Sequence, residues 1–240
     1  MWVVELSVAE AAERLQLDES RVRQLVNAGD LPARRAGKVW LLDGDAVALM
    51  SRRARPQGRP LSERRAWALL DLLAGGDAPW LAAPARSQVR SVLRRMASLG
   101  ADEWRAALRN RGQRVPVGGH SAAVRRLVQA SEAVPAGPHE ASAHGLDLVA
   151  LSARPEVYLD VNAWADLSRA LHLDKEASSS ASAVVRLVHE DGIIDRLRAN
   201  ERLLALAIAA DCLDDADPRA NHAGMELLSG AAAQALGAQA

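Results

Sequence analysis

The sequence contains few aromatic residues, cysteines or lysines. Among its 240 residues there is no Phe, one Tyr and one Cys, and only two of the 30 basic residues are Lys. A single Cys cannot form an intramolecular disulfide, and no apolar run approaches the roughly 20 residues that span a bilayer. Nothing at the N-terminus resembles a signal peptide. We therefore expect a cytoplasmic, Leu-, Val- and Ala-based helical protein.

Charge is unevenly distributed along the chain although the net charge is zero. Residues 1–134 carry 22 basic and 14 acidic residues, and residues 135–240 carry 8 and 16. This asymmetry suggests one surface for a polyanion and another for a different partner. The alternative is that the two segments are only solvated differently.

The first predicted helix begins after Ser7. Glu10 follows three residues later, which is the spacing of a capping box. Apolar residues then recur at i, i+3, i+4 and i+7, and they predict one buried face: Val8, Ala11, Ala12 and Leu15.

A second short helix is predicted over residues 19–28, capped by Asp18 and ended by Gly29. Val22, Leu25 and Val26 would be buried. Two short helices joined by a tight turn form a helix-turn-helix unit. The outward side chains can hydrogen-bond base edges or phosphates in a major groove, and they are Ser20, Arg21, Arg23, Gln24 and Asn27. The alternative is that Arg21 and Arg23 are ordinary solvated charges.

Two short strands around Gly37 are predicted to form a hairpin, or wing, with Arg34, Arg35 and Lys38 available for phosphates or the minor groove. A closing helix from Asp43 or Asp45 follows. Residues 51–60 are basic and broken by two Pro and a Gly, which indicates a linker along phosphates through Arg52, Arg53 and Arg55.

The order of helix, turn, helix, Gly-Asp-Leu-Pro, basic hairpin, Trp40 and Asp-capped helix resembles the winged helix-turn-helix of excisionase and MerR-type proteins. The resemblance covers about 50 residues. It implies that the N-terminal segment binds double-stranded DNA.

The remaining sequence predicts a mainly α chain with small β elements, in which a larger α+β region follows the winged helix-turn-helix. We expect domains at 1–55, 56–134 (basic, helical) and 135–240 (acidic, α/β). Helices are predicted over 61–74, 86–99, 102–110, 121–130, 163–171, 201–211 and 218–228, with strands over 111–117, 156–161 and 183–188. Residues 229–240 are predicted to be a frayed tail.

The basic region past the linker is itself a candidate contact surface. Residues 86–126 hold ten Arg against Asp102 and Glu103. A second DNA contact and a protein partner with an acidic face are both consistent with this composition.

The segment Ser142-Ala143-His144-Gly145-Leu146, followed by a short α/β stretch and a final Asp-Pro-Arg helix, resembles antitoxins of the AbiEi type. That resemblance implies an autoregulator that represses its own operon and counteracts a nucleotidyltransferase-type toxin. The alternative is an excisionase-like or MerR-like regulator whose C-terminal region serves oligomerisation or ligand sensing. A homodimer is compatible with either function.

No residue pattern indicates an enzyme, a cofactor or a metal site. His139 and His144 have no third ligand nearby in the sequence. Cys212 stands beside acidic residues, which raise the pKa of a thiol and make it a poor nucleophile. Asp214, Asp215 and Asp217 are interpreted as an acidic turn that caps the last helix, with Pro218 at its start.

Overall fold

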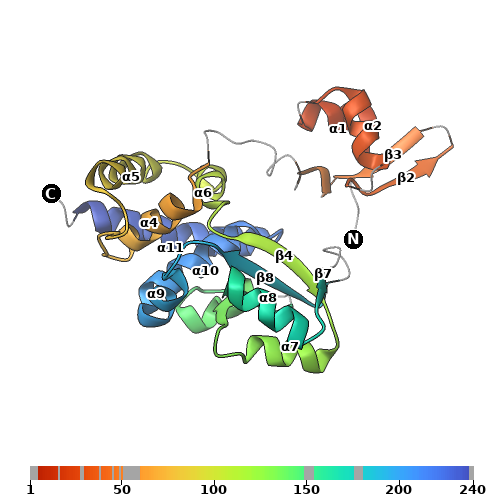
Figure 1. Ribbon diagram of the computed structural model, residues 1–240. Helices are drawn as coiled ribbons and strands as arrows, with labels where there is room; N and C mark the ends of the chain where they lie inside the picture. Colours follow the sequence, from red (N-terminus) through yellow and green to blue (C-terminus); the bar gives the residue numbers. More distant parts are fainter. Residues whose placement is uncertain are drawn as a thin grey trace. The chain divides into compact units, whose positions relative to one another are not determined.

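The computed structural model divides the chain into two compact units, residues 1–57 and 58–240 (Figure 1). It describes residues 5–15, 17–27, 30–37, 39–44, 46–48, 50, 60–148, 154–175 and 181–237. The fold is mainly α with two small sheets, which confirms the predicted class. Within the described residues, none of the helices has both the length and the apolarity needed to cross a membrane.

The N-terminal unit packs two helices, α1 (Val8–Leu15) and α2 (Glu19–Asn27), on a three-stranded antiparallel sheet. The strand order is β1-β3-β2, with β1 at Glu5–Ser7, β2 at Ala33–Ala36 and β3 at Val39–Asp43. The hairpin of β2 and β3 is the predicted wing. Strand β1 was not predicted, because three residues before a helix cap carry too short an alternating pattern to reveal a strand. The core is Leu6, Val8, Ala11, Ala12, Leu15, Val22, Leu31, Leu42 and Val47.

The C-terminal unit is built on a five-stranded mixed sheet of order β5-β6-β8-β4-β7. The predicted strand–helix–strand segment is present: β6 (Glu156–Asp160) leads through α8 (Val161–Ala170) to β8 (Ala183–Val188), which pairs with β6 in parallel. The other strands are β4 (Gln113–Gly118), β5 (Val134–Ala136) and β7 (Asp174–Lys175).

Both faces of this sheet are covered by helices (Figure 1). One face packs on α7 (Ser121–Val128) and α8, through side chains such as Val157, Leu159 and Val185. The residue between Val157 and Leu159, Tyr158, points to the opposite face because successive side chains alternate along a strand. That face packs on a larger helical layer: α4 (Glu63–Leu73), α5 (Ala83–Met96), α6 (Ala101–Leu108), α9 (Ile193–Ala199), α10 (Glu201–Leu213) and α11 (Pro218–Gly237).

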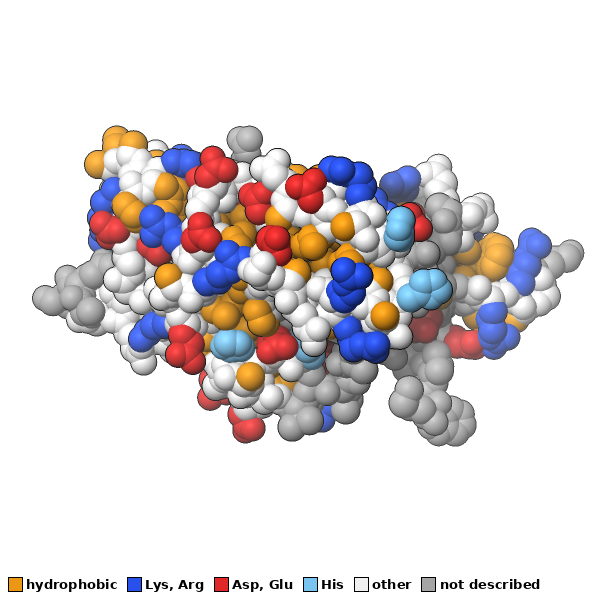
Figure 2. All heavy atoms as spheres, turned by 60° about the horizontal axis from the view of Figure 1, so that its bottom comes forward, with side chains coloured by type: hydrophobic (Ala, Val, Ile, Leu, Met, Phe, Trp, Pro, Cys, Tyr) orange, Lys and Arg blue, Asp and Glu red, His pale blue; other side chains and the backbone are white. Residues whose placement is uncertain are grey.

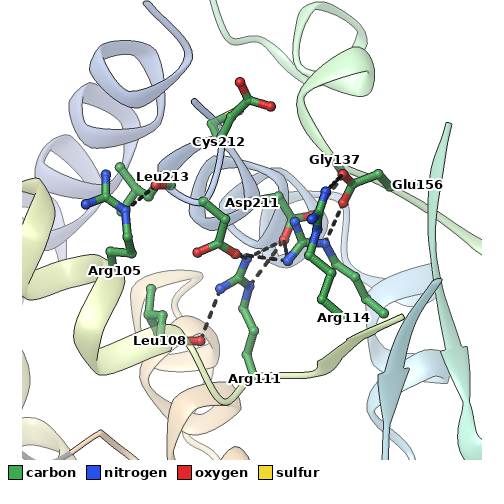
Figure 3. Close-up of polar contacts among 12 residues, drawn as sticks. Arg105, Leu108, Arg111, Arg114, Gly137, Glu156, Asp211, Cys212 and Leu213 are labelled. Carbon is green, nitrogen blue, oxygen red and sulfur yellow. Dashed lines mark hydrogen bonds and ion pairs between the residues drawn. The ribbon is translucent and has the colours of Figure 1, made fainter. Parts of the chain in front are cut away.

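A buried group of charged residues joins the sheet to α10 (Figure 3). Asp211 on α10 is fully buried, and its carboxylate accepts hydrogen bonds from the Arg111 guanidinium at 2.5 Å, the Tyr158 hydroxyl at 2.6 Å and the Gly137 backbone N–H at 2.9 Å. Arg186 on β8 lies 3.1 Å from the same carboxylate. The ring of Trp67 on α4 meets that of Tyr158 edge to face, with 5.5 Å between centroids.

The same group extends across the three central strands of the sheet, β6, β8 and β4. Glu156 accepts from Arg186 at 2.8 Å and from Arg114 at 3.0 Å, and these two arginines stand directly opposite each other on β8 and β4. Like charges in that position repel, so the Glu156 carboxylate between the two arginines is needed to offset their repulsion. Burial alone would raise the pKa of Glu156, but the neighbouring charges of Arg186 and Arg114 lower it.

Gly137 is required in this arrangement for two reasons. Its φ of 85° lies in the left-handed region, and a Cβ there would come within 2.8 Å of the Glu156 side chain. We call Arg111, Arg114, Glu156, Tyr158, Arg186, Asp211 and Asp214 the buried ion network.

The network accounts for part of the charge asymmetry and joins the two predicted C-terminal domains. Strand β4, from the basic segment, pairs with β8, from the acidic segment, so 56–134 and 135–240 fold as one unit. Counted by unit, residues 1–57 carry 9 basic and 8 acidic residues, and residues 58–240 carry 21 and 22. On the face drawn in Figure 2, basic and acidic side chains are interspersed.

Two further predictions need correction. The predicted tail, 229–240, belongs to helix α11 as far as Gly237, because Ala231 and Ala232 are buried against the helical layer. Asp214 was interpreted as part of a capping turn, but its carboxylate lies 2.6 Å from Arg111 and 3.0 Å from Arg186. Asp217 does cap, since it accepts from the Arg219 backbone N–H at 2.9 Å.

We predict that Asp211→Ala strongly destabilises the protein. The change leaves the buried Arg111 and Arg186 without their shared carboxylate, a loss that costs about 3–5 kcal/mol for buried pairs. The matched control is Asp166→Ala, which removes an ion pair with Arg169 whose side chains are 80% and 76% exposed. Urea unfolding should show a large loss of stability for the first variant and almost none for the second. Equal, small effects would contradict the central role of the network.

Candidate nucleic-acid interface

Side-chain caps fix the start of both helices of the N-terminal unit. The Ser7 hydroxyl accepts from the Glu10 backbone N–H at 3.2 Å, and the Glu10 carboxylate accepts from the Ser7 backbone N–H at 2.7 Å. This is the predicted capping box. Asp18 accepts from the Arg21 backbone N–H at 2.9 Å, which confirms the second cap. These caps fix the residue at which each helix begins.

Helix α2 buries one side and exposes the other. Val22 is fully buried, while Leu25 and Val26 are partly buried against the same core. The five side chains predicted to face a major groove are all exposed: Ser20, Arg21, Arg23, Gln24 and Asn27. They therefore share one outward face on a helix whose opposite side is fixed by packing.

The polar groups of this face are partly ordered by one another. Arg21 donates to the Gln24 amide oxygen at 3.0 Å, and Arg23 forms an ion pair with Glu19 at 2.5 Å. Both pairs are exposed, so they can be exchanged for contacts to bases or phosphates at little cost. Arg21, Gln24 and Asn27 present donors and acceptors of the kind that read base edges.

The hairpin holds its two arginines on opposite faces of the sheet. Arg34 forms a two-point ion pair with Glu5 on β1, with both N–O distances 2.6 Å. The hydrogen bond from Arg34 lowers the pKa of Glu5. Arg35 instead lies over the Trp40 ring, 5.4 Å from its centroid. A phosphate would have to displace Glu5 to reach Arg34, whereas Arg35 is exposed without a carboxylate partner in the described part of the chain.

The remaining predicted DNA contacts, Lys38, Arg52, Arg53 and Arg55, lie outside the described residues and stay predictions. The predicted closing helix is seen at residues 44, 46–48 and 50, and Asp43 accepts from the Ala46 backbone N–H at 3.2 Å. Sequence reasoning missed Glu5 as the partner of Arg34. The only signal in the sequence was that Glu5 stands two residues before the Ser7 cap. That position indicates a partner on the hairpin only once β1 is known to join the sheet.

A model of the helix-turn-helix domain family matches residues 5–50. Residues 5–50 are a helix-turn-helix domain. The match begins at Glu5, the first residue of β1, and ends within the closing helix. No curated protein and no solved structure matches the chain. The resemblance of the C-terminal part to AbiEi-type antitoxins is therefore supported only by the residues that suggested it.

The match supports DNA binding by this domain, and in helix-turn-helix proteins the second helix of the pair, which corresponds to α2, is the one that enters the major groove. Two kinds of group could suggest other chemistry: metal-ligating side chains and a reactive thiol. Among the described residues, no cluster of three or more His, Cys, Asp or Glu side chains could hold a metal ion. Burial, followed by the charges of Asp211 and Asp215, raises the pKa of the Cys212 thiol to about 12.

We predict that alanine at Arg21, Gln24 or Asn27 weakens specific DNA binding. Loss of a side chain that contacts a base costs on the order of 1–3 kcal/mol of discrimination. The measurement is a gel-shift titration on the DNA upstream of the coding sequence, with unrelated duplex as competitor. Arg169→Ala, on α8 in the other unit, is the control for loss of one exposed charge. Wild-type affinity and selectivity in all three variants would contradict this assignment of α2.

Proposed function

We propose that the protein is a transcription regulator that recognises an operator through α2. The observation that supports this most directly is the outward face of α2, where five polar side chains lie together without an apolar residue among them. Such a face has no use in the core, and its amide and guanidinium groups match the donors and acceptors of the major groove. The hairpin arginine Arg35 would contact the backbone beside it.

This proposal gives a first test on the natural promoter. We predict that the protein protects a short stretch upstream of its own coding sequence in a footprint and lowers expression of a reporter fused to that stretch. Arg21→Ala combined with Gln24→Ala should abolish both effects while leaving the thermal unfolding temperature unchanged, since both residues are exposed. A protein that binds all duplexes equally, and whose double variant represses normally, would refute the regulator function.

The more specific proposal is that the regulator is an antitoxin that represses its own operon and opposes a nucleotidyltransferase-type toxin. The C-terminal unit offers a surface for a protein partner. A groove of about 450 Å³ lies between α10, α11 and the turn at 145–147. Its floor includes Leu206, Ala223 and Ala231, and its rim carries Asp147 and Glu226.

The chemistry of this groove favours a partner that presents an apolar side chain next to a cation. Neither rim acid has an ion-pair partner among the described residues, whereas Arg202 on the same rim donates to Gln234 at 2.6 Å. Gly230 also lines the groove within α11, and a Cβ there would meet nothing within 4 Å. Glycine inside a helix costs roughly 1 kcal/mol relative to Ala, so its presence is consistent with keeping the groove open.

We predict that co-expression of the full chain with the product of the adjacent gene yields a complex and relieves any toxicity of that product. Gly230→Leu should fill the groove and disrupt the complex while leaving DNA binding intact. The control is Gly237→Leu at the end of α11, where a Cβ also meets nothing. A toxic neighbour that the full chain neither binds nor neutralises would end the antitoxin proposal.

An excisionase-like regulator is equally consistent with the helix-turn-helix domain. The gene next to this one separates the two functions: a nucleotidyltransferase-like neighbour supports the antitoxin, and an integrase supports the excisionase. In the excisionase case the C-terminal unit would serve oligomerisation or ligand sensing, and the groove would be the candidate site for either role.

A further inference from the structure

Helix α5 has an outer face that is polar and basic from Ser87 onward. Its inner side packs through Val89, Leu93 and Met96. Ala83 and Pro84 are exposed in the first turn, and the exposed positions after them lie on the side opposite the packed one: Ser87, Gln88, Ser91, Arg94, Arg95 and, just past the end, Ser98. The helix contains four Arg and no acidic residue. Its outer face therefore combines hydroxyl, amide and guanidinium groups with positive charge only.

Arg94 and Arg95 on this face differ in their side-chain partners from most other arginines of the C-terminal unit. Arg64, Arg105, Arg111, Arg114 and Arg186 are all paired with carboxylates. In contrast, neither Arg94 nor Arg95 has a side-chain hydrogen bond or an ion pair with any other described residue. Two adjacent guanidinium groups near the end of a helix with no acid on it attract an anion from outside the unit.

The composition of the face identifies the class of partner. Protein interfaces are centred on buried aromatic or aliphatic anchors, but the only large apolar side chains exposed among the described residues are Leu17 and Val39, both in the N-terminal unit. Arg, Ser and Gln without apolar neighbours are instead typical of contacts to DNA phosphates. An extended polyanion with regularly spaced charges suits this face better than a folded protein.

We propose that the outer face of α5 is a second DNA-contacting surface, which binds phosphates of the same duplex that α2 recognises. The inference rests on the proposed function, because it assumes that the helix-turn-helix domain brings the chain to DNA. Once α2 is bound, α5 meets the duplex at a high effective concentration set by the chain between the two units, so weak phosphate contacts add to the overall affinity. They add no sequence preference, because phosphates are the same at every step.

The experiment compares three full-length variants on the upstream duplex and on a mixed-sequence duplex. Arg94→Ala/Arg95→Ala removes the proposed contact. Arg169→Ala/Arg198→Ala is the matched control, since it also removes two exposed arginines of the same unit, but these are ion-paired with Asp166 and Asp195. Arg94→Lys/Arg95→Lys keeps the charge.

Affinity is measured as a function of salt. Each phosphate contact contributes about 0.9 to the slope of log K against log [salt], so the first variant should lower that slope by roughly 2 units on both duplexes. The control that removes the ion-paired arginines should leave the slope nearly unchanged, and the lysine variant should keep most of the wild-type slope. The ratio of affinities for the two duplexes should not change in any of the three.

Three results would overturn the proposal. The α5 variant and the ion-paired control could lower the slope equally, which would mean a general effect of net charge. The α5 variant could bind DNA like wild type but lose a complex with the adjacent gene product, which would assign the face to an acidic protein. It could also behave as wild type in both assays. Failure of the proposed function is recognised separately, because wild-type protein would then show no preference for the upstream duplex.

Discussion

The C-terminal unit depends on the carboxylate of Asp211. It is fully buried on α10, and four groups from different parts of the chain meet it: the Arg111 and Arg186 guanidinium groups, the Tyr158 hydroxyl and the Gly137 N–H. Removing buried charges from water is costly, so such a group persists only where every charge is paired and hydrogen-bonded. Hydrogen bonds have a preferred distance and angle, whereas the hydrophobic effect is non-directional, so the network constrains the distance and rotation of α10 over the sheet in addition to the apolar packing.

The network also changes the meaning of the charge pattern. From the sequence, a +8 segment followed by a −8 segment suggests two external partners. In the fold, Arg111 and Arg114 from the first segment meet Glu156, Asp211 and Asp214 from the second. Part of the asymmetry is therefore internal complementarity between two segments of one unit. Charges left exposed and unpaired, such as those of Arg94 and Arg95 on α5, are the ones that remain available to an outside partner.

Interactions between residues close together in the sequence could be predicted, whereas interactions between distant residues could not. The Ser7–Glu10 box and the Asp18 cap depend on residues three apart, so they were predictable and are present. The strands of the βαβ segment were predictable from their apolar runs. The Glu5–Arg34 pair spans 29 residues and the Arg111–Asp211 pair spans 100, and no local pattern encodes such pairings. The end of α11 was missed because its Ala-rich sequence looks the same in a tail and in a buried helix.

The exposed faces of α2 and α5 suggest how affinity and specificity for DNA are divided in this protein. On α2, the amides of Gln24 and Asn27 stand beside Arg21, and such groups distinguish one base pair from another. On α5, the one amide, Gln88, already accepts from Arg65 at 2.8 Å, so its face offers mainly guanidinium charge and hydroxyls. A short recognition helix with few base contacts gives selectivity but modest affinity. The phosphate contacts proposed for α5 would raise affinity without altering that selectivity, so substitutions on α2 and α5 should change the two properties independently.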